Sequence, residues 1–191
     1  GTLRWKDPVV RYNPAPDVVR EFFDDARKNE WVLTYDVETD GVDALNCELR
    51  CVGIGTDNEV LILGFLSIDG VSRFYSPEDE REIKRLLREV FDDESVRIAG
   101  HNAGYFDRLV CESHGLGTPT SLLDTILLHK LGASEYRHSL GFVGSVLTDV
   151  PAWKADHAGV TAKTDEELHQ YCATDVAVTS RIIQPLLEMV Y

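Results

Sequence analysis

Four acidic residues and one tyrosine lie in three short segments and could together hold metal ions. They are Asp36, Glu38, Asp107, Tyr171 and Asp175. Magnesium prefers oxygen ligands and keeps several waters, so a few carboxylates plus the phosphate oxygens of a substrate suit it. In two-metal nucleases, ions about 3.5–4 Å apart activate the attacking water and stabilise the leaving oxygen. These residue types therefore predict a two-metal site for phosphodiester hydrolysis.

The first segment is predicted to be a half-buried strand. Residues 31–39 alternate apolar and polar side chains and are rich in β-branched and aromatic residues. Because residues i and i+2 share a face of a strand, Asp36 and Glu38 should project side by side. Two adjacent carboxylates repel each other, and a cation relieves that repulsion. An isolated Asp-x-Glu is common in an acidic chain and suits a solvated strand end equally well.

The third segment is predicted to lie on a long helix. Thr164 and Glu167 fit a capping box, with Thr164 as the N-cap, and good helix formers follow them. Tyr171 and Asp175 would then lie one turn apart on one face. A metal-binding carboxylate and a phenol that orients a water would then lie next to each other on this helix.

The middle segment links a predicted strand, residues 96–100, to a short predicted helix, residues 104–114, which Gly115 should end. Asp107 lies in the first turn of this helix, and Asn102 comes just before it. Both are expected to face the same cleft as Asp36 and Glu38. In the expected site, Asp36 bridges the two ions, while Glu38 and Asp175 complete one shell and Asp107 supports the other through water.

These segments resemble the three motifs of the DEDD superfamily of 3′–5′ exonucleases, in its tyrosine-bearing branch. The resemblance runs from about Trp31 to the C-terminus. It is carried by Asp36–Thr39, Asn102 through Phe106 and Asp107, Tyr171 with Asp175, the pair Asp124-Thr125 and the residues His138–Leu140.

The resemblance implies an α/β protein with a ribonuclease H-like fold. Its mixed central sheet would have three antiparallel strands followed by parallel strands, with helices on its faces. It also implies release of nucleoside monophosphates from a single-stranded 3′ end by a water that Tyr171 orients. Two Mg²⁺ ions would be the cofactors, with Mn²⁺ as a substitute. Thr39 and Asn102 would contact the terminal nucleotides, and Phe106 would help to wall the site.

Within this branch, two further segments look most like the proofreading domains of bacterial and phage family A DNA polymerases. They are Pro151–Lys154 and Asp175–Thr179. This resemblance implies that the partners are a single-stranded DNA 3′ end and a polymerase domain, either in the same chain or separate. It also implies a cytoplasmic location, in a bacterial cell or a phage-infected host, with no membrane contact.

Two alternatives remain open. A ribonuclease D-like or Werner-like exonuclease would use the same residues on RNA or DNA ends, because the metals contact phosphate rather than the 2′-hydroxyl. A catalytically silent structural or partner-binding module usually lacks one of the acids, whereas this chain has all four. A flavodoxin-like module would need a Gly-rich phosphate loop, which the sequence lacks.

Composition favours one globular domain. The chain has 191 residues, of which 43% are hydrophobic, and no apolar run reaches the roughly 20 residues of a membrane span. We expect an N-terminal extension and helix over residues 1–30 and the exonuclease domain over 31–191.

The four cysteines lack zinc-site spacing and are expected to be reduced thiols. The net charge of −14 predicts weak, metal-dependent binding of nucleic acid, with a partner supplying a tighter grip.

Other elements follow from local signals. Helices are predicted over 16–28 and, with Ser76 as N-cap, over 77–91. Strands are predicted over 49–56 and 59–65, and Pro185 should kink or end the last helix. No strand is predicted in residues 1–13.

The stretch 132–164 is the least regular part of the sequence, because Gly141, Gly144, Pro151 and Gly159 interrupt it. It suits either a surface connection or a mobile rim over the 3′ end. Lys154 and Lys163 are expected to be solvated side chains, with phosphate neutralisation near the cleft as the alternative for either.

Overall fold

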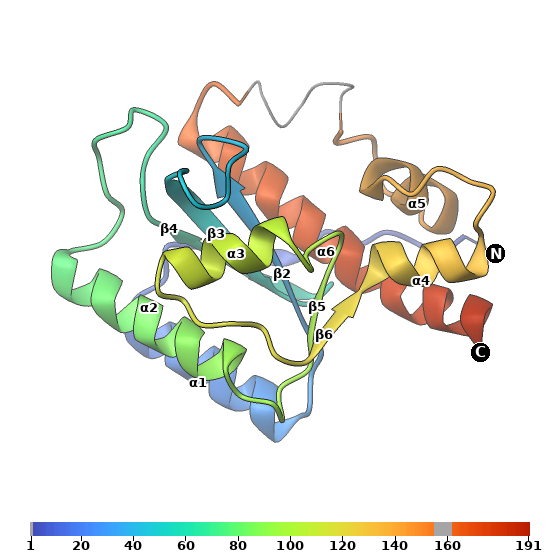
Figure 1. The fold of residues 1–191 in the computed structure, drawn as a ribbon, viewed down its shortest axis with the longest axis horizontal. Coiled ribbons are helices and arrows are strands. Elements are labelled where there is room, and N and C mark those ends of the chain that lie inside the picture. Colours follow the sequence, from blue (N-terminus) through green and yellow to red (C-terminus); the bar gives the residue numbers. More distant parts are fainter. Residues whose placement is uncertain (1, 155–161) are drawn as a thin grey trace.

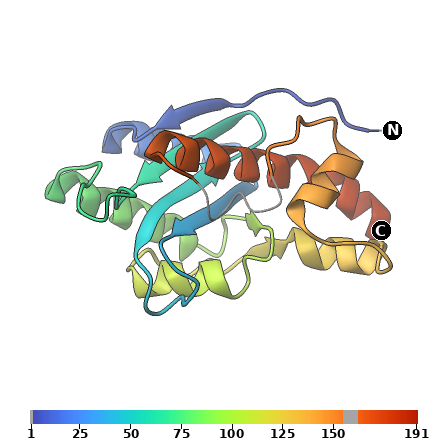
Figure 2. The same ribbon diagram turned by 90° about the horizontal axis from the view of Figure 1, so that it is seen from above.

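The computed structural model describes residues 2–154 and 162–191, which form a six-stranded sheet between two layers of helices (Figures 1 and 2). The strand order is β1-β4-β3-β2-β5-β6. β2, β3 and β4 are antiparallel, and β5 and β6 continue parallel to β2, as predicted. The strands are β1 (Val9–Tyr12), β2 (Leu33–Thr39), β3 (Leu49–Gly55), β4 (Glu59–Gly64), β5 (Ile98–Gly100) and β6 (Leu122–Asp124).

The helices are α1 (Pro16–Lys28), α2 (Pro77–Phe91), α3 (Phe106–Ser113), α4 (Thr125–Gly132), α5 (Leu140–Leu147) and α6 (Asp165–Val190). Their starts follow local chemistry. Ser76 caps α2 by accepting the N–H of Asp79, and Thr164 caps α6 by accepting the N–H of Glu167. The Glu167 carboxylate accepts from Lys163 N rather than from Thr164 N, so the capping box is shifted by one residue.

The two faces of the sheet bury different side chains because successive strand residues point to opposite sides. On β3 and β4, Val52, Ile54 and Leu63 belong to the core under α1, α2 and α3. Cys51 and Ile62, which point the other way, pack with residues of α6. This alternation fixes β2 as well: Val37 enters the core with α1 to α3, so Asp36 and Glu38 must face α6.

Two elements differ from the simplest expectation. Residues 9–12 form the edge strand β1, parallel to β4, where we expected no strand. Pro185 lies within α6 but does not end it, since the helix continues to Val190. Leu186, the next residue, is fully buried against α4 and α5, and this packing offsets the backbone bond that a proline removes.

Within the described residues of the irregular stretch, the chain forms the helix α5, which starts at the Ser139 cap. Residues 155–161 of the expected surface connection or mobile rim, including Gly159, lie outside the described residues. Among the helices of 2–154 and 162–191, none is long and apolar enough to cross a membrane.

Candidate active site

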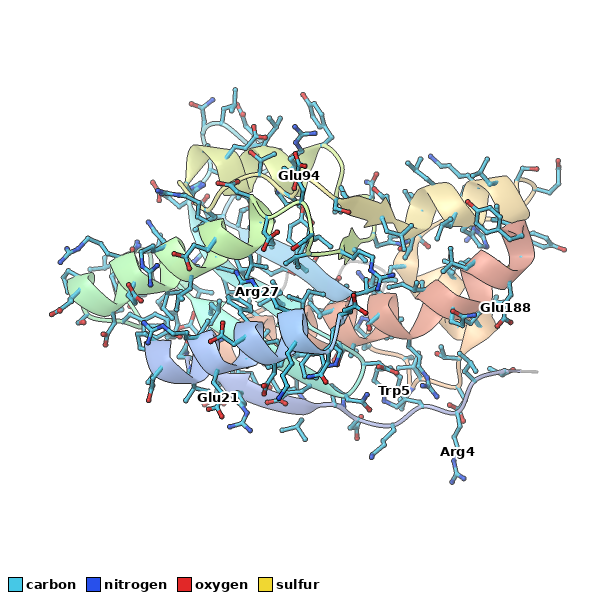
Figure 3. All side chains as sticks on the ribbon, turned by 90° about the horizontal axis from the view of Figure 1, so that it is seen from below. Arg4, Trp5, Glu21, Arg27, Glu94 and Glu188 are labelled. Carbon is cyan, nitrogen blue, oxygen red and sulfur yellow. The ribbon has the colours of Figure 1, made fainter. Side chains whose placement is uncertain are left out.

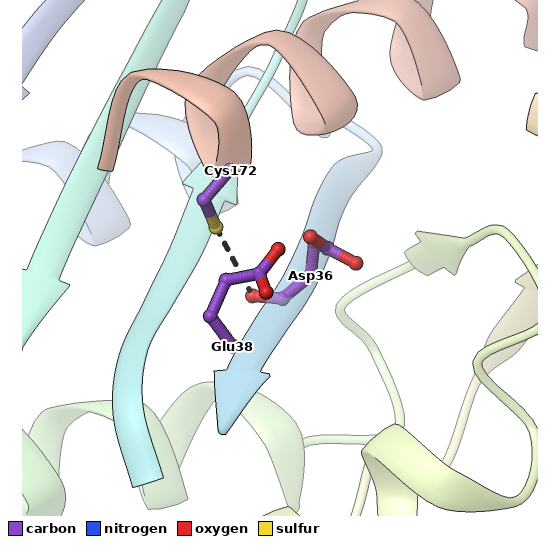
Figure 4. Close-up of side chains that lie close together, drawn as sticks. All are labelled: Asp36, Glu38 and Cys172. Atoms are coloured by element: carbon purple, nitrogen blue, oxygen red, sulfur yellow. Dashed lines mark hydrogen bonds between the residues drawn. The ribbon is translucent and has the colours of Figure 1, made fainter. Parts of the chain in front are cut away.

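Asp36 and Glu38 project from β2 toward α6, as the strand periodicity predicted (Figure 4). Ligand atoms of Asp36, Glu38 and Cys172 all lie within 4.8 Å of one another. The Cys172 thiol donates a hydrogen bond to the Asp36 backbone oxygen at 3.8 Å. A hydrogen bond with Cys51, together with burial, holds the pKa of the Cys172 thiol well above its usual value, so the group that approaches the acids is neutral.

The two strand carboxylates are destabilised as anions. Burial, followed by the charges of Asp175 and Glu38, raises the pKa of Asp36 well above its ordinary value. Burial and the charge of Asp175 raise the pKa of Glu38 to about 8. The Asp36 Oδ2 atom is buried and has no hydrogen-bond partner in the described chain. A buried unpaired oxygen among like charges is the environment that a bound cation stabilises.

Asp107 lies in the first turn of α3, as predicted, and is half-buried. Burial and then the charges of Asp124 and Asp175 raise its pKa to about 7. Its own charge raises the pKa of both Asp36 and Glu38, so the second predicted motif reaches the same electrostatic site.

Asp175 completes the set from α6, where it is only 5% exposed. The Trp153 indole donates to its Oδ1 at 2.7 Å, and the Lys154 ammonium donates to its Oδ2 at 3.0 Å. Burial raises the pKa of Asp175, while Lys154 and Trp153 oppose that rise. The carboxylate is therefore held in one orientation.

Tyr171 lies one turn before Asp175, and its hydroxyl accepts a hydrogen bond from Lys154 Nζ at 2.9 Å. Burial is the main cause that raises the pKa of the phenol, which stays protonated. The prediction that Lys154 is a solvated side chain is wrong, because its ammonium is held by Tyr171 and Asp175. Lys163 is exposed, as expected.

The loop between β5 and α3 is tied to Asp124, the N-cap of α4. The Asp124 carboxylate accepts the backbone N–H of Asn102 at 2.8 Å and that of Gly104 at 3.3 Å. Asn102 has a φ of 59°, in the left-handed region, which asparagine tolerates better than most residues. His101 bonds to Thr125 and to the His138 backbone oxygen, so it braces this loop.

The residues predicted to contact nucleotides lie around this loop and the end of β2. Thr39 ends β2 and donates to the Gly41 carbonyl, Asn102 is exposed, and Phe106 is half-buried with its ring against the core. Their roles in substrate binding stay predictions.

The residues present fit divalent cations with oxygen ligands. Four carboxylates with raised pKa values share one electrostatic site, and one buried oxygen lacks a partner in the described residues. Oxygen-only donors suit Mg²⁺ or Mn²⁺ better than metals that prefer sulfur or nitrogen.

Comparison with known proteins agrees with this geometry. The sequence profile described as 3′-5′ exonuclease matches residues 15–191. The chain belongs to this 3′–5′ exonuclease family. It is therefore a phosphodiester hydrolase of the DEDD superfamily. A search of curated protein sequences found no match.

Solved structures share the fold of this exonuclease. Brucella melitensis NrnC bound to pGG has a TM-score of 0.66 at 20% identity, covering 100% of this chain and 82% of that chain. Escherichia coli RNase D, an exoribonuclease involved in structured RNA processing, has a TM-score of 0.67 at 15% identity, covering 95% of this chain and 45% of that one. The catalytic core of Trypanosoma brucei RRP6 has a TM-score of 0.63 at 18% identity, covering 97% of this chain and 49% of that chain.

Sequence reasoning missed the effects of three residues on the exonuclease site. Trp153 and Lys154 hold Asp175, and Asp124 adds negative charge beside Asp107. The sequence carried weak signals for all three, since Asp124-Thr125 and Pro151–Lys154 were among the segments that resemble related exonucleases.

The metal-free exonuclease is expected to lose stability as pH rises from 7 to 8.5. Because the pKa of Glu38 is raised to about 8, the folded protein keeps a proton that the unfolded chain releases above its ordinary pKa near 4. The contribution of Glu38 to the free energy of unfolding is therefore fully present below the pKa of the unfolded chain. It is lost as the pH rises through the pKa of the folded protein. Thermal unfolding in EDTA should show a melting temperature lower by a few degrees at pH 8.5.

The Glu38→Gln variant is the matched control, because it keeps every histidine and cysteine and removes only this proton. Its melting temperature should fall less than that of the wild type over the same interval. An excess of Mg²⁺ should also shrink the fall in the wild type, since cations then replace the protons. A melting temperature that falls equally in both proteins would contradict the electrostatic assignment of Glu38.

Proposed function

We propose that this protein removes nucleoside monophosphates one at a time from the 3′ end of single-stranded RNA. The observation that carries the reaction is the convergence of four carboxylates from β2, α3 and α6 with the Tyr171 hydroxyl. Asp36, Glu38, Asp107 and Asp175 would hold two Mg²⁺ ions. When bound, the ions supply an acidified water and charge stabilisation at the leaving oxygen.

The protein's own groups orient the reactants. Lys154 Nζ donates to the Tyr171 oxygen, so the phenol proton is directed away from Lys154 and remains able to donate to a water or phosphate oxygen. The same ammonium and the Trp153 indole hold both oxygens of Asp175. This places a fixed carboxylate and a neutral hydroxyl one helical turn apart, which is the arrangement that orients a water for attack.

RNA is the substrate that we propose because the solved structures with this fold include RNase D, named as an exoribonuclease, and an NrnC bound to pGG. A small footprint suits the net charge of −14, since only the terminal phosphates would contact the protein, at the place where cations sit. Proofreading of a DNA 3′ end is the second candidate. It is supported by Pro151–Lys154, the segment that resembles polymerase proofreading domains, whose Trp153 and Lys154 contact Asp175.

The test is digestion of matched 5′-labelled RNA and DNA oligonucleotides of one sequence with Mg²⁺, Mn²⁺ or EDTA. We expect ladders that shorten from the 3′ end only with a metal, and faster on RNA. The Asp36→Ala variant should leave both substrates intact. Faster digestion of DNA would support the proofreading candidate. No digestion of either under any condition would favour a catalytically silent module.

A further inference from the structure

A hollow lies on the side of α6 turned away from Tyr171. It has a volume of about 480 Å³ and is lined by side chains that include Tyr12, Phe74, Asp165, Glu166 and His169. His169 and Tyr171 are two residues apart, which places them about 200° apart around the helix axis. The hollow is therefore separate from the carboxylate site. Its volume is in the range of small-ligand sites.

Aromatic rings form one wall of this hollow. The rings of Tyr12 and His169 are within 13° of parallel, with centroids 6.5 Å apart, and the Phe74 ring lies 4.9 Å from that of His169. Tyr12 is 49% exposed, so part of this aromatic surface is open to solvent. Tyrosine and phenylalanine rings carry a negative potential on their faces and attract cations.

Two carboxylates of the first turn of α6 lie beside the rings. Asp165 is held in place, because it accepts hydrogen bonds from Ser67 Oγ at 2.6 Å and from Ile68 N at 2.9 Å. Glu166 is exposed. Within 2–154 and 162–191, no ion pair involves either carboxylate. The aromatic surface is thus next to two carboxylates that pair with no cation of the described residues.

His169 gives an independent sign that the hollow is incomplete. It is only 4% exposed, and its Nε2 atom has no hydrogen-bond partner in the part of the chain that the structure describes. Leaving a buried polar atom unpaired costs free energy, and structures usually satisfy such atoms. A bound polar group would remove that cost.

We propose that this hollow binds an arginine side chain of a basic partner protein. A guanidinium is planar, stacks on aromatic faces and pairs with carboxylates through directed N–H donors, so it matches rings and acids in one site. A nucleobase would also stack on Tyr12, but its phosphate would approach Asp165 and Glu166 and be repelled. The net charge of −14 favours a basic partner over an acidic one.

The probe is the capped tripeptide acetyl-Gly-Arg-Gly-amide, titrated into the full chain while NMR follows the signals of Tyr12 and His169. We expect saturable shifts with arginine, weaker shifts with the lysine peptide and none with the citrulline peptide, which keeps the planar shape without the charge. Tyr12→Ala and Glu166→Gln should each weaken binding about fivefold. Tyr12→Phe keeps the ring and should bind as the wild type does.

Glu188→Gln is the matched control for Glu166→Gln, because Glu188 lies near the other end of α6 (Figure 3). It should leave arginine binding unchanged. All these variants should keep their nuclease rate, and Tyr12→Phe and the two glutamine variants should also keep the wild-type melting temperature. Equal shifts with the citrulline and arginine peptides would overturn the proposal, since binding would not then depend on charge. Shifts with adenosine monophosphate and none with the arginine peptide would overturn it in favour of a nucleic-acid contact.

Discussion

Replacing Asp36 with alanine is expected to lower the rate of 3′-end hydrolysis about 1,000-fold or more. The charges of Asp175, Glu38 and Asp107 all act on Asp36. Losing a carboxylate that would hold the ions is expected to remove several kcal/mol of stabilisation of the transition state, at about 1.4 kcal/mol for each factor of ten in rate. The measurement is the initial rate of mononucleotide release at saturating Mg²⁺.

The same substitution should not weaken the metal-free fold. The Asp36 Oδ2 atom has no hydrogen-bond partner in the described residues, and its negative neighbours oppose its charge. Removing the charge therefore relieves repulsion, so the melting temperature in EDTA should stay the same or rise. Asp36→Asn, which keeps the shape, should show this most clearly.

Asp17→Ala is the matched control for Asp36→Ala, because Asp17 is an exposed aspartate in the first turn of α1. It should change neither the rate nor the response to Mg²⁺. If Asp36→Ala hydrolysed the substrate at the wild-type rate, Asp36 would not be a metal ligand. If it lost activity only by unfolding, its melting temperature would fall, which separates that outcome from the loss of a ligand.

The strand and helix positions of the acids could be predicted because their signals are local. Alternation over residues 31–39 placed Asp36 and Glu38 on one face, and the Thr164 cap set the start of α6. The Ser76 cap likewise gave α2 its correct bounds. Each signal lies within a few residues of the feature that it determines.

The edge strands could not be predicted in this way. β1 has four residues and β6 has three, so neither contains enough positions for a periodic pattern. β1 is a strand because it pairs with β4, about 50 residues later in the chain, and β6 because it pairs with β5. Such pairing depends on the assembled sheet rather than on local propensity.

Lys154 shows the same limit within the site. In the sequence it is a single lysine in an irregular stretch, for which solvation is the ordinary expectation. Its contacts arise because the segment after α5 crosses α6 beside Tyr171 and Asp175, and no local pattern encodes that crossing. The contacts of Lys154 with Tyr171 and Asp175 were therefore identified only from the structure.

Tyr171→Phe is expected to lower the turnover number about 100-fold while leaving metal affinity nearly unchanged. The phenol has no carboxylate oxygen to offer a cation, and we propose that its proton orients a water, so its loss should affect the chemical step by the amount typical of a positioned proton donor. Single-turnover rates across a Mg²⁺ titration measure both quantities at once. The Mg²⁺ concentration for half-maximal rate should match that of the wild type.

Tyr191→Phe is the control for Tyr171→Phe, since Tyr191 is 97% exposed at the C-terminal end of α6 and its hydroxyl makes no hydrogen bond in the described residues. It should keep the wild-type rate. Because Lys154 donates to both Tyr171 and Asp175, the loss of one acceptor leaves the ammonium paired with the carboxylate, and the site should stay folded. A higher Mg²⁺ concentration for half-maximal rate, with an unchanged maximal rate, would mean that Tyr171 supports the ions rather than the water. The assigned role of the phenol would then be wrong.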